Sequence, residues 1–275
     1  MTDTPNTART IGVFDSGVGG LSVLKAIRER EPSVDLIYIA DSANAPYGSR
    51  SAEFIEQRAR HVAKSLLSAG AQIIVVACNT ATAVAGQKLR SELTVPIVAM
   101  EPAIKPAVAV TKSGVIGVLG TERTLDSAAV DRLCSQFGRD VSILLRPCPG
   151  LVELVECGDL KSEQTRRTLE AIVHPLIEQG ADTLVLGCTH YVFLQPTIQD
   201  IVGSEVQVLE SSAAVARQVM RYWASEGPGV VRDRIGRETF LTTGSADHAE
   251  TIFSQLWGTP VEVRELESRS ACEEA

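Results

Sequence analysis

The sequence predicts an α/β protein of two similar lobes, each a mostly parallel sheet flanked by helices, with a functional site in the cleft between them. Strand-like and helix-like segments alternate with short connections, which is typical of parallel α/β sheets. One segment also occurs twice: residues 66–81 read LLSAGAQIIVVACNTA, and residues 176–191 read LIEQGADTLVLGCTHY. The copies align without a gap, so that Cys78 matches Cys188. We therefore expect two lobes related by a pseudo-twofold axis.

The first lobe begins at the N-terminal strand and continues to about residue 100. A strand over 10–14 (TIGVF) leads through the turn DSGVGG into a helix from about 21 to 30. Each later strand is a short apolar run, as expected where both faces of a parallel sheet are buried. The other predicted elements are a strand over 36–40, a loop over 42–50, a helix over 52–69, a strand over 73–77, a helix over 80–92 and a strand over 96–99.

The pattern restarts in the second half. The strand over 113–119 (SGVIGVL) resembles the opening strand, with Gly120 and Thr121 in place of Asp15 and Ser16. The elements predicted after it are a strand over 141–145, the turn RPCPG, a helix near 152–156, a helix over 164–179 and strands over 183–186 and 206–209.

The C-terminal part is expected to return to the first lobe. It carries a predicted helix over 213–226 and a final strand near 238–242. The expected division is therefore 1–100 with 210–275 for the first lobe, which contributes Asp15 and Cys78, and 101–209 for the second, which contributes Cys188 and His190.

Composition excludes several classes of protein. The formal net charge of −8 argues against binding to nucleic acid or to an anionic membrane. The first ten residues lack the apolar core of a signal peptide, and no apolar stretch approaches the ~18 residues of a membrane span. Six cysteines without framework spacing predict reduced thiols. We expect a cytoplasmic protein.

Cys78 and Cys188 each follow a predicted buried strand. Ligands of doubly wound sheets bind at the carboxyl ends of the strands. Cys78 is expected at the positive end of the next helix, with Asn79 and Thr80 as capping residues, where a thiolate and a substrate carboxylate are both favoured. A buried cysteine that only packs is the alternative.

Cys188 repeats this arrangement, with Thr189 as the capping hydroxyl and His190 two residues on. Thiols on opposite sides of one cleft suit a reaction that removes a proton from one face of a carbon and returns it to the other. The same cleft would also suit a two-lobed protein that binds an amino acid without converting it.

The turn DSGVGG matches neither GxGxxG nor a Walker loop. Its glycines allow a tight turn, and Asp15 would point into the cleft, where it could pair with a substrate amine or exchange a proton with a thiol. The alternative is that Asp15 caps the following helix. No CxxC pair occurs and no lysine follows a strand, so we expect neither a metal nor pyridoxal phosphate, and no cofactor.

Six segments together resemble the glutamate racemase family, in that family's order, between Gly12 and Tyr191. They are GVFDSGVGGLSVL, ADSANAPYG, VVACNTAT, VAMEPAIKPA, PCPGLVELVECG and LGCTHY. The resemblance implies a cofactor-independent, two-base mechanism in which Cys78 and Cys188 flank the α-carbon of glutamate. By family analogy Cys188 acts on L-glutamate and Cys78 on D-glutamate.

The resemblance also assigns supporting roles. Asp15 and His190 match auxiliary acid/base positions, and Glu156 matches a further carboxylate. The positions that match substrate-binding residues are Asp15, Ser16, Tyr47, Gly48, Asn79, Thr80, Thr121, Thr189 and His190. Glu210 departs from the family, in which a shorter residue is common. The family also implies a bacterial cytoplasmic protein that supplies D-glutamate for peptidoglycan, and a homodimer.

Other functions stay open at this point. An aspartate racemase, or a related two-cysteine isomerase or decarboxylase, could use the same two lobes. Replacing either Cys78 or Cys188 by serine should abolish a two-base racemase and barely affect a protein that only binds. For an enzyme we expect the lobes to close on the substrate, because proton abstraction from a weak carbon acid needs water excluded.

Overall fold

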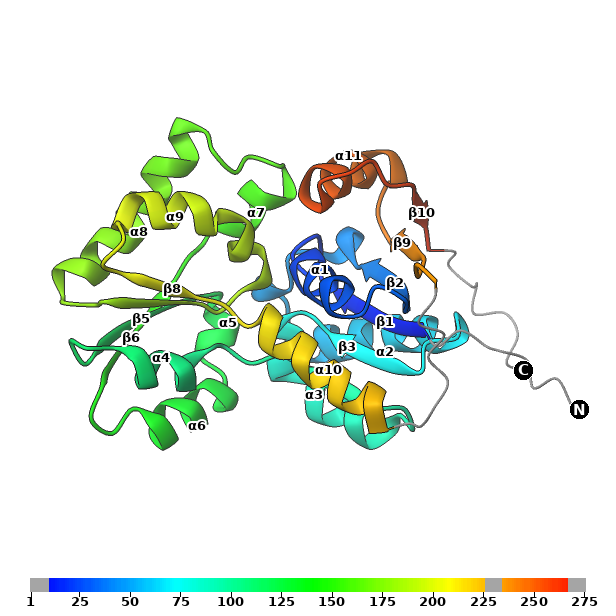
Figure 1. Ribbon diagram of the computed structural model, residues 1–275, viewed down its shortest axis with the longest axis horizontal. Helices are drawn as coiled ribbons and strands as arrows, with labels where there is room; N and C mark the ends of the chain where they lie inside the picture. The colour runs from blue at the N-terminus through cyan, green and yellow to red at the C-terminus, as the bar shows by residue number, and fades with distance from the viewer. Residues whose placement is uncertain (1–9, 226–233, 267–275) are drawn as a thin grey trace, which may run out of the picture.

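Two parallel sheets form the framework of the protein (Figure 1). The computed structural model describes residues 10–225 and 234–266; the N-terminal residues 1–9 and residue 226 of the predicted helix over 213–226 lie outside these ranges. All strand pairings are parallel within the described residues. The predicted α/β fold with two lobes is therefore confirmed.

The six-stranded sheet, with the helices packed against it, is called the first lobe here. Its strand order is β10-β9-β2-β1-β3-β4. The strands are β1 (Thr10–Asp15), β2 (Asp35–Ala40), β3 (Ile73–Val76), β4 (Ile97–Ala99), β9 (Glu238–Thr242) and β10 (Val263–Glu265).

The four-stranded sheet, with its helices, is called the second lobe. Its order is β6-β5-β7-β8, which repeats the order β2-β1-β3-β4 of the first lobe. The strands are β5 (Val115–Gly120), β6 (Ser142–Pro147), β7 (Thr183–Leu186) and β8 (Gln207–Leu209).

Most helices begin and end within two residues of the predicted positions. Helices α2 and α8 each start at a serine N-cap, because the Ser51 hydroxyl accepts from Phe54 N–H and the Ser162 hydroxyl from Thr165 N–H. The predicted helices are α1 (Leu21–Arg30), α2 (Ala52–Ser68), α3 (Asn79–Glu92), α7 (Leu151–Glu156), α8 (Glu163–Glu178) and α10 (Ser212–Ser225).

Several elements have no counterpart among the predictions. Residues 189–194 form a 3₁₀ helix, η3 (Thr189–Leu194), and the loop over 42–50 contains two short 3₁₀ turns, η1 (Ser42–Asn44) and η2 (Tyr47–Ser49). Besides β10, the further helices are α4 (Ile104–Val110), α5 (Glu122–Leu125), α6 (Ala128–Phe137), α9 (Gln195–Val202) and α11 (Ala246–Trp257).

The repeated segment has the same backbone in both lobes. Gly70 and Gly180, the matched glycines before β3 and β7, have φ of +92° and +91°. This left-handed conformation is costly for any residue with a side chain, so glycine is required in both copies. The following Cys78 and Cys188 consequently emerge at equivalent strand ends.

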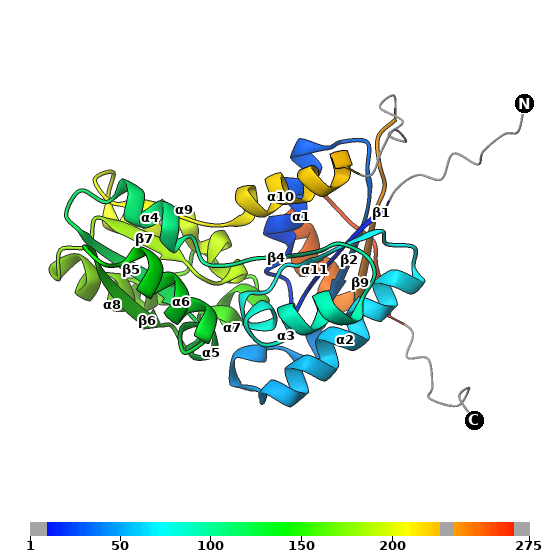
Figure 2. The same ribbon diagram turned by 90° about the horizontal axis from the view of Figure 1, so that it is seen from below.

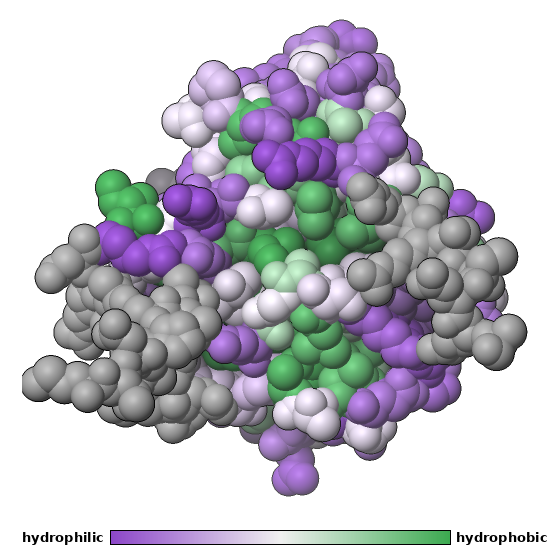
Figure 3. Space-filling view, turned by 90° about the vertical axis from the view of Figure 1, so that its right-hand side faces the viewer, coloured by the Kyte–Doolittle hydropathy of each residue, from purple (hydrophilic) through white to green (hydrophobic). Residues whose placement is uncertain are grey.

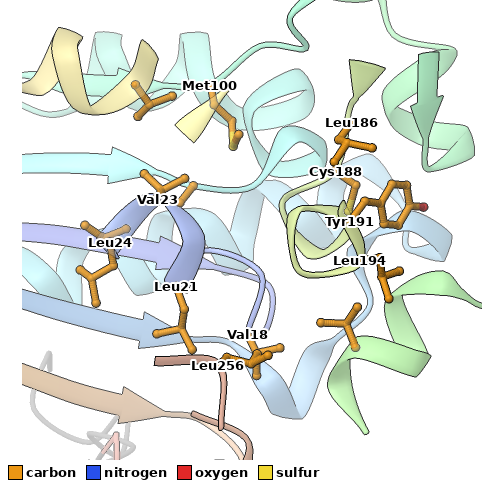
Figure 4. Close-up of a cluster of buried hydrophobic side chains, with 14 of the residues drawn as sticks. Val18, Leu21, Val23, Leu24, Met100, Leu186, Cys188, Tyr191, Leu194 and Leu256 are labelled. Atoms are coloured by element: carbon orange, nitrogen blue, oxygen red, sulfur yellow. The ribbon is translucent and has the colours of Figure 1, made fainter. Parts of the chain in front are cut away.

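One hydrophobic cluster spans both lobes. Val18 and Leu21 of the first lobe and Tyr191 and Leu194 of the second lobe belong to it, and Cys188 lies among them (Figure 4). Two further clusters lie within the first and the second lobe, respectively. The lobes therefore share a continuous core beside the strand ends.

The chain crosses between the lobes in two segments, before α4 and before α10 (Figure 2). The Ser211 hydroxyl in the second crossing donates to the Glu101 carbonyl in the first at 2.7 Å. Strands β9 and β10 lie in the first sheet, beside β2. The expected lobe boundaries at residues 100 and 210 stay a prediction.

No helix in the described ranges is long and apolar enough to cross a membrane. Figure 3 shows the end of the first lobe that faces away from the second, where apolar patches alternate with polar side chains.

Candidate active site

Cys78 is placed by β3 and α3. It is the N-cap of α3, and its sulfur accepts a hydrogen bond from Ala81 N–H at 3.4 Å. Its thiol lies 3.7 Å from the Ser16 hydroxyl oxygen, to which it can donate. The sequence predicts Asn79 and Thr80 as capping residues; this is wrong, because both lie in the first turn of α3 and the thiol itself makes the capping bond.

Cys188 occupies the equivalent position after β7. It precedes η3 and makes no side-chain capping bond, and its sulfur lies 3.8 Å from His190 Nδ1. Thr189 does not cap the helix as predicted. Its hydroxyl donates instead to Oδ2 of Asp15 at 2.9 Å, because Asp15 of the first lobe lies directly opposite.

Both thiols line one small pocket between the lobes. Its free volume is about 10 Å³, enough for about one water molecule. Pro46 and Val152, which the sequence analysis did not single out, also line it. The other lining residues are Cys78, Cys188, Ser16, Tyr47, Gly48, Asn79, Thr80, Thr121, Thr189 and His190. Asp15 and Glu156 lie behind this lining.

Asp15 is completely buried at the end of β1. Its Oδ1 accepts from Ser16 N–H at 2.6 Å and from the Ser16 hydroxyl at 3.2 Å. It does not cap α1, whose N-cap is Gly20. Burial raises the pKa of Asp15 above its ordinary value, although the positive charge of His190 and the hydrogen bond from Thr189 oppose this. Asp15 is therefore a proton acceptor of increased basicity beside Cys78.

His190 and Glu156 form a buried pair next to Cys188. His190 Nε2 lies 2.6 Å from Glu156 Oε1, which also accepts from Val18 N–H of the first lobe at 2.9 Å. Burial alone would lower the pKa of His190, but its hydrogen bonds to Cys188 and Glu156 and their charges raise it well above its ordinary value. The pKa of Glu156 is lowered: burial opposes this, but the hydrogen bond and charge of His190 outweigh it. The pair thus favours an imidazolium facing the Cys188 sulfur.

The glycines of DSGVGG allow the second lobe to approach. A Cβ on Gly17 would lie 1.8 Å from Glu156 Oε1, and one on Gly19 would lie 2.3 Å from His190 Nδ1 and 2.7 Å from the His190 backbone nitrogen. No side chain fits at either position. The backbone of this turn therefore packs directly against the His190–Glu156 pair.

The environment of Cys78 differs from what its place at a helix N-terminus suggests. Burial and then the negative charge of Asp15 raise the pKa of Cys78 well above its ordinary value, and the bonds from Ala81 N–H and Ser16 only partly offset them. The expectation that this position favours a thiolate is wrong for the resting site. Cys78 rests as a thiol, ready to donate a proton.

Hydroxyl groups from both lobes meet at the part of the pocket that Thr80 and Thr121 line. The Thr80 hydroxyl lies 3.1 Å from those of Thr121 and Thr124, and the Thr121 hydroxyl lies 3.0 Å from that of Thr124. Thr124 is fully buried on α5 and escaped the sequence analysis, because α5 was not predicted. A ligand oxygen reaching this end would meet hydroxyl donors.

Tyr47 is held by a buried carboxylate. Its hydroxyl donates to Asp41 Oδ2 at 2.5 Å, and Arg58 contacts the same carboxylate through Nε at 2.9 Å and Nη2 at 2.7 Å. The Thr243 hydroxyl donates to Asp41 Oδ1 at 2.8 Å. The loop that carries Tyr47 and Gly48 is thereby fixed to α2 and to the end of β9.

Asn79 has an unused amide. It is 4% exposed, and neither its side-chain nitrogen nor its oxygen has a hydrogen-bond partner among the described residues. A buried amide without partners is costly unless a ligand completes its bonds.

Glu210, the departure noted in the sequence, accepts a hydrogen bond from Ser212 N–H at the start of α10 and does not line this pocket.

Comparison with known proteins gives a consistent result. The family model for Asp/Glu/hydantoin racemases matches residues 19–219. The glutamate racemase of Pseudomonas aeruginosa is 48% identical over 257 residues, covering 93% of this chain and 97% of the relative. That of Methylococcus capsulatus is 50% identical over 256 residues, covering 93% and 94%.

A solved structure agrees with these relatives. The crystal structure of Escherichia coli glutamate racemase in complex with L-glutamate and the activator UDP-MurNAc-Ala has a TM-score of 0.83 and 30% sequence identity, covering 94% of this chain and 98% of that one.

Proposed function

The chain belongs to the Asp/Glu/hydantoin racemase family, and we propose that it interconverts L-glutamate and D-glutamate without a cofactor, with Cys78 and Cys188 as the two bases. The observation that carries this proposal is the pair of buried thiols at equivalent strand ends that line one pocket. Glutamate is favoured as the substrate because the relatives that cover nearly the whole chain are named glutamate racemases.

The reaction moves one proton off the α-carbon and another onto it. From L-glutamate, the Cys188 thiolate takes the α-proton, so that an S–H bond forms as the C–H bond breaks and the electron pair remains on the α-carbon. The Cys78 thiol then gives its proton to the opposite face and becomes a thiolate. The reverse reaction exchanges the two roles. The assignment of each cysteine to one enantiomer follows the family resemblance.

The neighbours of the two thiols fit these roles. The His190–Glu156 pair presents positive charge 3.8 Å from the Cys188 sulfur, which stabilises a thiolate there. On the other side, the raised pKa of Asp15 makes it a suitable base for the Cys78 proton. We therefore propose that Cys188 acts as the base on L-glutamate and Cys78 as the acid, as the family resemblance implies.

The pocket lining suits a small dianion that carries an ammonium group. We propose that Asn79 and Ser16, with the backbone N–H groups at the start of α3, bind one carboxylate, and that the hydroxyls of Thr80 and Thr121 bind the other. Thr189 would face the ammonium group, with Asp15 behind it as the acceptor of the Thr189 hydroxyl. The unpaired amide of Asn79 supports this arrangement.

The pocket must open to admit glutamate, because about 10 Å³ holds only about one water molecule. We propose that the lobes part at the two crossings and close again over the substrate, excluding water from the carbanion. Small-angle scattering should show a more compact particle with glutamate than without it. Identical curves would contradict closure.

The cellular proposal follows from the family resemblance, and the relatives named glutamate racemases come from Pseudomonas aeruginosa and Methylococcus capsulatus. We propose that the protein works in the cytoplasm, supplies D-glutamate for peptidoglycan, and forms a homodimer. Sedimentation equilibrium tests the homodimer directly.

The deciding experiment is incubation with L-glutamate in D₂O without added cofactor. Loss of optical activity should accompany the entry of deuterium at the α-carbon of the inverted product. Cys78→Ser and Cys188→Ser should each abolish racemisation, whereas Cys134→Ser, on α6 outside the pocket, should retain it. Racemisation of aspartate alone would move the assignment to an aspartate racemase. Binding of glutamate without deuterium exchange would identify a binding protein.

A further inference from the structure

We propose that Tyr38 is a positioning residue for the Cys188 side of the site, acting through the single peptide group that joins Gly17 to Val18. This inference rests on the proposed racemase function, because it assigns a role within that reaction. Tyr38 lies on β2, outside the pocket lining.

The geometry forms a continuous path. The Tyr38 hydroxyl donates to the Gly17 carbonyl at 2.6 Å. The nitrogen of the same peptide group is that of Val18, and its N–H donates to Glu156 Oε1 at 2.9 Å. Glu156 Oε1 in turn lies 2.6 Å from His190 Nε2. One phenol of the first lobe is thereby connected to the imidazole that faces Cys188.

The chemistry of the peptide group gives this path its effect. A hydrogen bond to a carbonyl oxygen draws electron density from the amide nitrogen, so the N–H becomes a stronger donor, and chained hydrogen bonds strengthen one another at low dielectric. Tyr38 therefore strengthens the bond from Val18 N–H to Glu156. It also fixes the orientation of the peptide, since the carbonyl and the N–H point in opposite directions.

The surroundings keep Tyr38 in the donor role. The side chain is completely buried. Burial, followed by the negative charges of Asp15 and Glu156, raises the pKa of its phenol well above its ordinary value. The hydroxyl stays protonated at any pH at which the protein works.

The path also explains why the turn has its particular sequence. Gly17 has no room for a Cβ, which would lie 1.8 Å from Glu156 Oε1. The same residue supplies the carbonyl that Tyr38 holds. The contacts of this peptide group with Tyr38 of the first lobe and with Glu156 of the second lobe thus both require glycine at position 17.

The test compares Tyr38→Phe with Glu156→Ala and with the double variant. Phenylalanine retains the ring that packs edge-on against Phe253 at 5.7 Å between centroids, so the variant should fold. We expect Tyr38→Phe to lower kcat/KM for L-glutamate by about 3- to 10-fold, as for one lost hydrogen bond. In the Glu156→Ala background the same substitution should change kcat/KM by less than about twofold, because the path then has no acceptor.

Ser22→Ala is the matched control. The Ser22 hydroxyl also donates to a carbonyl of this turn, that of Gly19 at 2.9 Å, but onto a different peptide group. Its effect on kcat/KM should be the same with and without Glu156. Equal effects of Tyr38→Phe in both backgrounds would overturn the proposal and leave Tyr38 a purely structural residue.

A measurement independent of turnover separates this inference from the proposed function. The chain has only 4 histidines, which simplifies the spectrum of ¹⁵N-labelled imidazoles. Tyr38→Phe should move the His190 Nε2–H proton downfield, because Val18 N–H and His190 Nε2–H donate to the same oxygen and a weaker Val18 bond leaves Glu156 Oε1 a better acceptor for His190; Ser22→Ala should not. A shift in a protein that fails to racemise glutamate would retain the positioning role and reject the function. An unchanged signal in an active racemase would reject the positioning role alone.

Discussion

Thr189 donates a hydrogen bond of 2.9 Å to Oδ2 of Asp15, 174 residues earlier in the chain. Thr189 follows Cys188, and Asp15 adjoins Ser16, whose hydroxyl lies 3.7 Å from the Cys78 sulfur. The bond therefore links the surroundings of the two thiols across the two lobes. It also keeps a carboxylate in a completely buried place, where ionisation is costly.

We expect Asp15→Asn to trade activity for stability. The variant retains an acceptor for Ser16 N–H but loses the base beside Cys78, so kcat should fall by about 10²- to 10⁴-fold. The folded-state pKa of Asp15 is raised by burial. Its contribution to stability is therefore complete below the unfolded value of about 4 and is lost as pH rises through the folded value.

Thermal unfolding checks this sign. The melting temperature of Asp15→Asn relative to the parent should rise between about pH 4 and pH 8. Over this range the parent loses stability as its buried Asp15 ionises, whereas asparagine does not ionise. A relative melting temperature that falls across this range would contradict the prediction, as would full activity of the variant.

The His190–Glu156 pair predicts a different pH dependence. His190 has a raised pKa, so its contribution to stability is complete below about pH 6.5 and is lost as pH rises through the folded value. Glu156 has a lowered pKa, so its contribution is present above about pH 4.3 and is lost as pH falls through the folded value. Together they stabilise the fold most between these limits.

Glu156→Gln should therefore reduce the free energy of unfolding most at about pH 5–6 and less at alkaline pH. The control is Glu163→Gln, whose ion pair with Arg167 on the exposed face of α8 has side-chain exposures of 69% and 71%. Urea unfolding at several pH values measures both. A Glu156→Gln difference that grows steadily toward alkaline pH would refute the ion pair.

Much of the fold could be predicted because its strands are uninterrupted apolar runs that end at polar turns. The repeat of Gly70 at Gly180 identified two equivalent lobes without any structural knowledge. Among the helices that were not predicted, α5 has only 4 residues and α4 contains Pro106 among β-branched residues. Such segments show no helical periodicity, and packing against the second sheet decides their conformation.

The site was predictable where it depends on strand ends, as for Cys78, Cys188 and Asp15. Glu156 came only from the family resemblance, because its partner Val18 lies 138 residues away. Tyr38, Asp41 and Thr124 act through buried contacts that leave no local pattern. The raised pKa of Cys78 depends on the depth of burial and on Asp15, neither of which a helix N-terminus reveals.

Gly19→Ala should inactivate the enzyme by displacing the second lobe. The added Cβ would lie 2.3 Å from His190 Nδ1 and 2.6 Å from the Thr189 hydroxyl. These groups belong to a packed turn and cannot simply rotate away. We expect kcat/KM to fall at least about 100-fold, as for a misplaced catalytic group.

Gly86→Ala provides the contrast. Gly86 lies within α3, and its added Cβ would have its nearest neighbour at 3.5 Å, which is ordinary contact. Activity should be retained, and the free energy of unfolding should rise by about 0.5–1 kcal/mol because alanine favours the helix. Similar activity of the two alanine variants in the D₂O assay would show that close approach at Gly19 is not required.

Asp41→Ala should be among the most destabilising single changes in the first lobe. Asp41 is completely buried and accepts from Tyr47, Arg58 and Thr243. Removing it leaves a mostly buried guanidinium and a buried phenol without their acceptor, which costs about 3–5 kcal/mol for a buried ion pair. Because Tyr47 lines the pocket, KM for glutamate should rise as well.

Glu262→Ala is the control, since the Glu262–Arg264 pair is 72% and 68% exposed and such pairs contribute about 0–1 kcal/mol. Urea unfolding gives both values, and a loss below about 1 kcal/mol for Asp41→Ala would mean that water replaces the carboxylate and that the loop does not depend on it.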